Sequence, residues 1–209
     1  AYFCQVKDKT GKIIYRLPNH HFDIKATSPG RGTIVLLGGV IDYGEINRNL
    51  FWIRPNYVDT VYSTSNWTDV RPYYIIQRNN RAADYAWSVR MKVGDITRED
   101  AEREQLCNVY ALKSGLLFNY LFNPKQQGAG FCPANGKSKT ISRLFKNDID
   151  SYCPSIDLWQ AIAYKTLYQK EDYLYLLIDA FKFFEEGAKS PFPDLTEESN
   201  PVLVKLKLK

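Results

Sequence analysis

The sequence predicts a single α+β domain, residues 1–209, in which an N-terminal antiparallel sheet precedes three or four helices and a returning C-terminal edge strand. Three observations carry this prediction. Short segments rich in β-branched and aromatic residues fill residues 1–95. Apolar residues recur at three- and four-residue steps in residues 96–190. Apolar residues then alternate with lysines in residues 201–209, which is typical of a strand with one wet face.

In the first part of the chain, strands are separated by turn sequences such as SPGRG, DYGEIN and TSNWTD. Glycine, proline, asparagine and aspartate favour turns, whereas the segments between them have β-forming composition. The segments indicate an antiparallel sheet, since no helical pattern lies between them. Strands are expected at residues 12–17, 22–26, 33–40, 50–54, 57–63, 73–78 and 86–93.

The pattern changes at Asp95, after which a long helix is predicted over residues 98–122. Thr97 is a candidate N-cap, acidic residues follow in the first turn, and Pro124 ends the apolar run. After a loop at residues 123–137, the same reasoning gives a short helix and two longer ones. They fall within residues 139–149, 156–170 and 171–189, the last ended by Gly187.

The C-terminal strand is expected to return to the N-terminal sheet. Val202, Val204, Leu206 and Leu208 share one face of it, and Lys205 and Lys207 lie on the other with Leu203 and Lys209. Lysines on a wet face mark an exposed edge, where a partner or a second copy of the chain can add a strand. A basic tail without structure is the alternative.

Composition bounds the class of protein. With 44% apolar and 24% charged residues, the 209-residue chain is expected to fold and to bury a core in one domain. No apolar run approaches the roughly 18 residues of a membrane-spanning helix. The net charge of +5 is carried by residues 1–95, which is compatible with an anionic partner and equally with ordinary solubility.

The four cysteines predict an exported, disulfide-bonded protein, either secreted and extracellular or periplasmic. None of the four stands in a C-x-x-C pair, which argues against a zinc site. The preferred pairing is Cys132 with Cys153 and Cys4 with Cys107; four reduced, buried thiols in a cytosolic protein are the alternative. The start at a small residue is what signal-peptide cleavage leaves. In a eukaryotic secretory protein, Asn66 in the sequence NWT would be a glycosylation site.

The only two histidines, His20 and His21, are weak catalytic candidates. Neighbours in a strand point to opposite faces, so at most one is a general base, with Asp23 as its orienting carboxylate. The downstream SPGRGT sequence is followed by a β-branched run rather than a helix, so its glycines are interpreted as turn residues and not as a phosphate loop. No metal and no cofactor are expected.

A binding surface is predicted instead in residues 51–81, where aromatic residues and arginines are interleaved. Aromatic rings stack on sugars or bases, and arginines bind phosphate or carboxylate, although the same aromatic residues also serve cross-strand packing. The proposed binding residues are Trp52, Arg54, Trp67, Arg71, Tyr73 and Arg78.

The first functional hypothesis is therefore a non-enzymatic, exported protein that binds a partner protein or assembles with itself through this aromatic and arginine-rich sheet. The alternative is a secreted hydrolase acting on an anionic polymer, either nucleic acid or an acidic glycan, through His20 or His21 and the neighbouring arginines.

Overall fold

The structure is a computed structural model of the whole chain. It describes residues 2–18, 41–55, 58–78, 80–84, 86–87, 90, 97–122, 126–134, 136–137, 139–141, 144–145, 156–164, 166–185 and 192–207. None of the helices within these ranges is long and apolar enough to cross a membrane.

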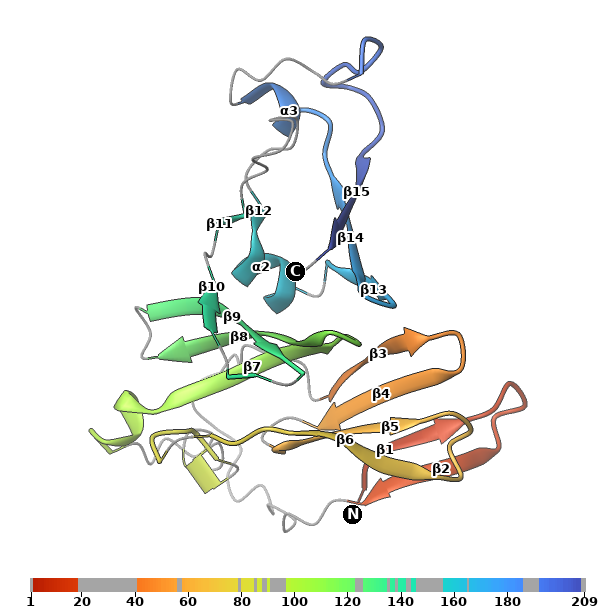
Figure 1. Cartoon of the computed structure of the whole chain (residues 1–209), viewed down its shortest axis with the longest axis vertical. Helices are drawn as coiled ribbons and strands as arrows, with labels where there is room; N and C mark the ends of the chain where they lie inside the picture. The colour runs from red at the N-terminus through yellow and green to blue at the C-terminus, as the bar shows by residue number, and fades with distance from the viewer. Residues whose placement is uncertain are drawn as a thin grey trace, which may run out of the picture.

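The described residues form mainly β-structure, and the predicted α+β fold with three or four helices is wrong (Figure 1). A hairpin of β1 (Tyr2–Lys7) and β2 (Ile13–Pro18) precedes a four-stranded meander. The meander contains β3 (Ile41–Asn47), β4 (Leu50–Pro55), β5 (Thr60–Thr64) and β6 (Val70–Ile75) in that order.

A second four-stranded sheet has the order β10-β9-β8-β7, with β7 (Glu104–Ala111), β8 (Gly115–Phe122), β9 (Gln126–Pro133) and β10 (Lys139–Ile141). A short pair joins β11 (Leu144–Phe145) to β12 (Ile156–Asp157). The last sheet has the order β13-β14-β15, with β13 (Tyr168–Lys170), β14 (Tyr173–Ile178) and β15 (Val202–Lys207). The helices are η1 (Asp100–Glu102), α2 (Leu158–Ala163) and α3 (Lys182–Glu185).

The long helix expected at residues 98–122 is instead η1 followed by the hairpin of β7 and β8. A bulge interrupts the pairing of β7, because Leu106 lies opposite Tyr120 while Val109 lies opposite Phe118. The extra residue puts Leu106 and Val109 on the same face of the strand, three positions apart. This step imitates the helical period on which the prediction depended.

β8 adds a second reason for the error, because both of its faces are covered. Leu117 packs with α2 and β14, whereas Leu116 packs on the other face with Trp52 of β4 and Val61 of β5. A strand that is buried on two sides has a continuous apolar sequence, which in one dimension resembles a buried helix. The sheet β10-β9-β8-β7 is therefore the central layer of the molecule, between two hydrophobic clusters.

The other predicted helices are mostly strands as well. Among the described residues of 156–170 only α2 is helical; the side chain of Asp157 caps it by accepting a hydrogen bond from the Gln160 amide at 3.1 Å. The described part of residues 171–189 contains β14 and the four helical residues of α3. Of the short helix expected in residues 139–149, the described residues form β10 and β11. The burial of side chains along β14 alternates with a period of two, but almost all of its residues are apolar, so this period was not visible in the sequence.

The N-terminal part also departs from expectation at two places. The sequence DYGEIN, interpreted as a turn, lies within β3, and Ala86, Trp87 and Arg90 of the strand expected at residues 86–93 are helical. β2, β4, β5 and β6 overlap the strands expected at residues 12–17, 50–54, 57–63 and 73–78. The strands expected at residues 22–26 and 33–40 lie outside the described residues.

Gly44 explains why a turn-like sequence forms the β3 strand. It lies opposite Trp52 in the β3–β4 pairing, and a Cβ at this position would be 2.6 Å from the indole nitrogen. The indole therefore lies across the strand and donates a hydrogen bond to Oε1 of Gln169 at 3.0 Å. Gln169 in turn donates to the carbonyl of Ala111. One glutamine thus connects β4, β7 and β13.

The C-terminal strand is present, with Leu206 buried, Val202 and Val204 half-buried, and Leu203, Lys205 and Lys207 exposed. Its partner differs from the expected one: β15 pairs with β14, from Ile178 opposite Val202 to Tyr173 opposite Lys207, and not with the N-terminal sheet. β15 is the last strand in the order of its sheet, so its position at an edge is as predicted.

Ending the chain after Asn200 removes β15, and we expect the free energy of unfolding to fall by on the order of 3–5 kcal/mol. Leu206 and two half-buried valines leave the cluster formed by β14 and α2. Urea denaturation followed by tryptophan fluorescence measures the change. The substitution Leu203→Ala, at an exposed position of the same strand, should cost less than about 0.5 kcal/mol. A truncated chain as stable as the full chain would contradict this assignment.

Candidate binding cleft

Described residues line a cleft of about 790 Å³ beside the central sheet. Its size lies within the range of roughly 300–1,000 Å³ that is typical of ligand sites. One wall is the chain from Tyr74 to Arg78 together with Ala82, and the floor is formed by β7, β8 and β9. The turn after β9 and the first residue of β10 complete the rim, through Ala134, Gly136, Lys137 and Lys139.

Two aromatic rings form much of the floor. Phe118 and Tyr120 project from the same face of β8 and lie opposite Gly130 and Gly128 of β9. A Cβ at either glycine would overlap the ring opposite it, so the absence of a side chain lets each ring lie on the backbone of β9. The two ring centroids are 6.3 Å apart and the planes are tilted by 45°. The result is a broad apolar platform, continued by Leu106, Val109 and Leu116.

The opposite wall is held in place by polar contacts to its backbone. The Tyr74 hydroxyl donates to the carbonyl of Leu112 at 3.1 Å, and burial raises the pKa of this phenol above its ordinary range. Arg78 forms an ion pair with Asp59 and donates a hydrogen bond to the carbonyl of Ala83. Ala82 pairs in parallel with Glu104 at the start of β7, which joins the wall to the floor.

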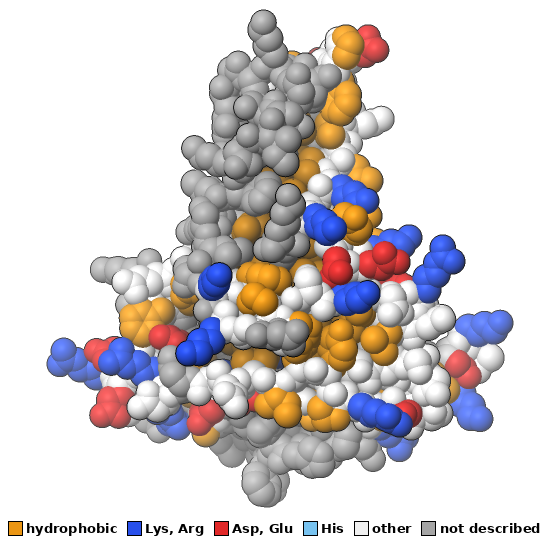
Figure 2. Space-filling model, in the orientation of Figure 1, with side chains coloured by type: hydrophobic (Ala, Val, Ile, Leu, Met, Phe, Trp, Pro, Cys, Tyr) orange, Lys and Arg blue, Asp and Glu red, His pale blue; other side chains and the backbone are white. Residues whose placement is uncertain are grey.

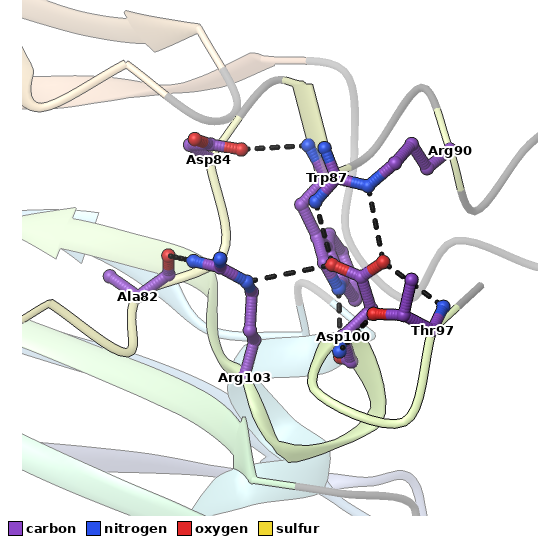
Figure 3. A network of polar contacts seen from close by, with 7 residues as sticks. All are labelled: Ala82, Asp84, Trp87, Arg90, Thr97, Asp100 and Arg103. Atoms are coloured by element: carbon purple, nitrogen blue, oxygen red, sulfur yellow. Dashed lines mark hydrogen bonds and ion pairs between the residues drawn. The ribbon is translucent and has the colours of Figure 1, made fainter. Parts of the chain in front are cut away.

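Asp100 anchors the base of this wall (Figure 3). Its buried carboxylate accepts two hydrogen bonds from Arg90, at 2.6 and 3.1 Å, and one from the Thr97 amide at 3.2 Å. The Arg103 guanidinium lies 3.5 Å away and also donates to the carbonyl of Ala82. These donors, Arg90 first, hold the pKa of Asp100 well below its usual value.

The charge of the rim is mainly positive. Exposed Lys137 and Lys139 stand at one side of the cleft and Arg78 at the other, and Glu104 is the acidic residue among the described lining residues. Arg78 is already bound to Asp59, so the two lysines are the basic groups that face solvent. An apolar aromatic floor beside two ammonium groups suits a ligand with an apolar body and an anionic group.

Behind the floor, a buried polar network joins the two four-stranded sheets. Asp42 of β3 accepts hydrogen bonds from Nη1 of Arg54 at 3.0 Å, from Nδ2 of Asn108 at 3.0 Å and from the Val109 amide at 3.1 Å. The Asn108 amide donates to Oδ1 of Asn119 at 2.8 Å, which fills the bulge of β7. Burial lowers the pKa of the Arg54 guanidinium, and the charge of Asp42 opposes that shift.

The structure separates the six predicted binding residues. Trp52 and Arg54 are buried, with Gln169 and Asp42 as partners. Trp67 is half-buried in the loop after β5 and packs against Tyr15 and Phe51, at centroid distances of 6.1 and 6.4 Å.

The remaining three lie nearer the surface. Arg71 is exposed and paired with Asp69, and Tyr73 packs edge-on against Tyr74, with centroids 4.6 Å apart. Arg78 alone of the six lines the cleft. The role of this set in binding stays a prediction.

The structure describes some of the other predicted sites and not others. His20, His21 and Asp23 lie outside the described residues. Asn66 is exposed, and its side-chain oxygen accepts a hydrogen bond from the Thr68 hydroxyl at 2.8 Å. Within the described ranges, no group of three histidine, cysteine, aspartate or glutamate residues is arranged to hold a metal ion.

No disulfide is formed among the described side chains. Cys107 is buried and Cys132 half-buried on the cleft floor, and both are free thiols. Burial raises the pKa of Cys107 to about 12, so this thiol is protonated at neutral pH. The side chains of Cys4 and Cys153, their proposed partners, lie outside the description.

Apart from Arg78, the residues that line the cleft were missed from sequence. A signal was present in QQGAGFC, residues 126–132, where glycines alternate with larger residues and follow the aromatic run LLFNYLF. Alternate glycines in a strand indicate close approach of a neighbouring group, here the two rings. Comparisons with family models, curated proteins and solved structures found no match, so the cleft is interpreted from its own chemistry.

Replacing Asp42 by Ala leaves the guanidinium of Arg54 buried without its carboxylate, and we expect a loss of about 3–5 kcal/mol in the free energy of unfolding. Guanidinium denaturation measures the loss. The matched control is Asp69→Ala, which removes an exposed ion pair with Arg71 and should cost less than about 1 kcal/mol. Equal costs for the two substitutions would mean that the buried network does not join the sheets.

Asp100→Asn should lower the melting temperature at pH 7, because an amide cannot bind two guanidinium groups as a carboxylate does. The folded-state pKa of Asp100 lies below the ordinary 3.8, so its contribution is present above pH 3.8 and is lost as the pH falls below that value. The difference between wild type and variant should therefore shrink from pH 7 to pH 3. Thermal melts of both proteins test this, with the exposed Asp194→Asn as control; a difference independent of pH would refute it.

Proposed function

We propose that the protein is a binding protein whose cleft takes an amphipathic anionic ligand. The apolar part of the ligand lies on Phe118 and Tyr120, and its anionic group meets Lys137 and Lys139. The observation that carries the proposal is the combination of an aromatic floor and a lysine rim in one cleft of about 790 Å³. Binding and secretion were both expected from sequence, and secretion remains part of the proposal.

The architecture around the cleft supports a binding role, because its walls are tied down before any ligand arrives. Arg78 and Ala82 each connect the wall to another element, Arg103 donates to the carbonyl of Ala82 while paired with Asp100, and the glycines of β9 seat the aromatic rings. A cleft that is already formed loses less conformational entropy when a ligand binds. The hydrolase hypothesis rests on His20, His21 and Asp23, which lie outside the described residues, and it stays a prediction.

Anilinonaphthalene sulfonate has the required chemistry, an aromatic body and one sulfonate, and is a suitable probe. We expect it to bind the folded protein with increased fluorescence. The double substitution Lys137→Glu/Lys139→Glu should weaken its affinity by about tenfold, the equivalent of about 1.4 kcal/mol. Fluorescence titration at low salt measures the affinity, and circular dichroism verifies that each variant is folded.

The control Lys7→Glu/Lys9→Glu makes the same change of charge in the first hairpin, away from the cleft. It should bind the probe as tightly as wild type, within about twofold. Weakening of equal size in both variants would show that the net charge, and not the cleft, attracts the probe. A wild-type protein that does not bind the probe would overturn the proposal.

A further inference from the structure

The outer face of the sheet β13-β14-β15 presents an ordered set of side chains. The strand registers place Leu177 opposite Leu203 in one row. The next row contains Tyr168, Tyr175 and Lys205, and the last contains Lys170, Tyr173 and Lys207. Alternate residues of β14, namely Leu174, Leu176 and Ile178, face the core, so these rows point away from it.

The face is apolar at one end and basic at the other. Leu177 is 66% exposed and Leu203 is 62% exposed, which makes them an aliphatic pair in solvent. The Lys205 ammonium lies 3.7 Å from the centroid of the Tyr173 ring, and the ring centroids of Tyr168 and Tyr175 are 6.3 Å apart. Single exposed leucines are ordinary, whereas a cross-strand pair continuous with three tyrosines forms a patch.

Beyond the leucine pair, the charge changes sign. Asp179 follows β14, and Asp194, Glu197 and Glu198 lie in the segment that leads into β15; all four are exposed. Charges of the opposite sign are also present: exposed Lys182 lies at the acidic end, and the basic end carries exposed Glu171 and half-buried Asp172, which accepts a hydrogen bond from the Ser114 amide. Figure 2 shows hydrophobic side chains along the upper projection of the molecule, an acidic side chain at its far end, and basic side chains together with acidic ones at its foot.

We propose that a second copy of the chain covers this face, related to the first by a two-fold axis that passes near Leu177 and Leu203. An antiparallel arrangement places the leucine pair of one copy on that of the other. The same rotation brings the lysines of each copy, Lys205 and Lys207, to the acidic end of its partner. The face is thus complementary to itself in both apolarity and charge, as an isologous interface requires.

The charge pattern favours a second copy over other occupants. A membrane of anionic lipids or an anionic polymer would attract the lysines, but the acidic residues beyond the leucines would repel it. We expect a face of three short strands to bury less than the roughly 800 Å² per partner of a standard interface. The dimer should therefore be weak, with a dissociation constant on the order of micromolar.

Charge exchange tests this proposal without removing the apolar contact. Lys205→Glu/Lys207→Glu and Glu197→Lys/Glu198→Lys should each give a monomer, because like charges then meet across the two-fold axis. A mixture of the two variants should form a heterodimer, since both of its contacts again pair opposite charges. A chain carrying all four substitutions should recover the wild-type dimer. Sedimentation velocity from about 10 to 300 μM, a range chosen around the expected constant, measures each state.

Circular dichroism of each variant verifies folding, and Lys7→Glu/Lys9→Glu, which changes the charge equally on the first hairpin, should dimerise as wild type does. A wild type that remains monomeric at every concentration overturns the proposal. So does a mixture of the two variants that shows no heterodimer. Sedimentation of monomeric protein with phosphatidylserine vesicles, abolished by Lys205→Glu/Lys207→Glu, would assign the face to a membrane instead.

Discussion

The carboxylate of Asp42 is the contact on which the arrangement of the two four-stranded sheets depends. It stands on β3 at the edge of one sheet and accepts hydrogen bonds from Asn108 and Val109 of β7 at the edge of the other. Two sheet edges that approach without pairing would leave backbone amides unsatisfied, and the carboxylate satisfies one of them. The nearby Arg54 balances its charge in the interior. Removing either member would leave the other charge buried alone.

This junction also explains the bulge in β7. The extra residue turns the Asn108 side chain toward Asp42, and Asn119 of β8 accepts the amide hydrogen that the bulge frees. The same bulge sets Leu106 and Val109 on the cleft side and Tyr110 on the other, where its hydroxyl donates to the carbonyl of Leu167. A local irregularity of one residue therefore decides which side chains form the cleft floor.

The two sides of the central sheet contact different parts of the molecule. One side packs against α2 and β14, and beyond β14 the outer face carries the leucines, tyrosines and lysines proposed to meet a second copy. The other side packs partly against the meander and leaves Phe118 and Tyr120 at the cleft. The proposed cleft and the proposed contact face thus involve different sides of this layer, so the two proposals do not compete for the same residues.

Local patterning determined several features from the sequence alone. Some features depend mainly on neighbouring residues, so the local sequence was enough to predict them. They are the alternation in β15, the β-forming segments of β2, β4, β5 and β6, and the loop around Trp67. The binding surface expected in residues 51–81 stays a prediction, and the structure buries two of its proposed residues, Trp52 and Arg54. Composition states which chemistry is available and not which side of a strand is covered.

Tertiary structure decided the rest, because it depends on contacts between distant residues. The helices expected after Asp95 are mainly strands, since β8 is covered on both faces and the bulge of β7 imitates a helical step. β3 is a strand because Trp52 occupies the space above Gly44 and Arg54 neutralises Asp42. The cleft exists because the Asp100 network and the Ala82–Glu104 bridge bring two segments more than 20 residues apart side by side. Such pairings are set by the burial of both partners together, and no window of local sequence contains both.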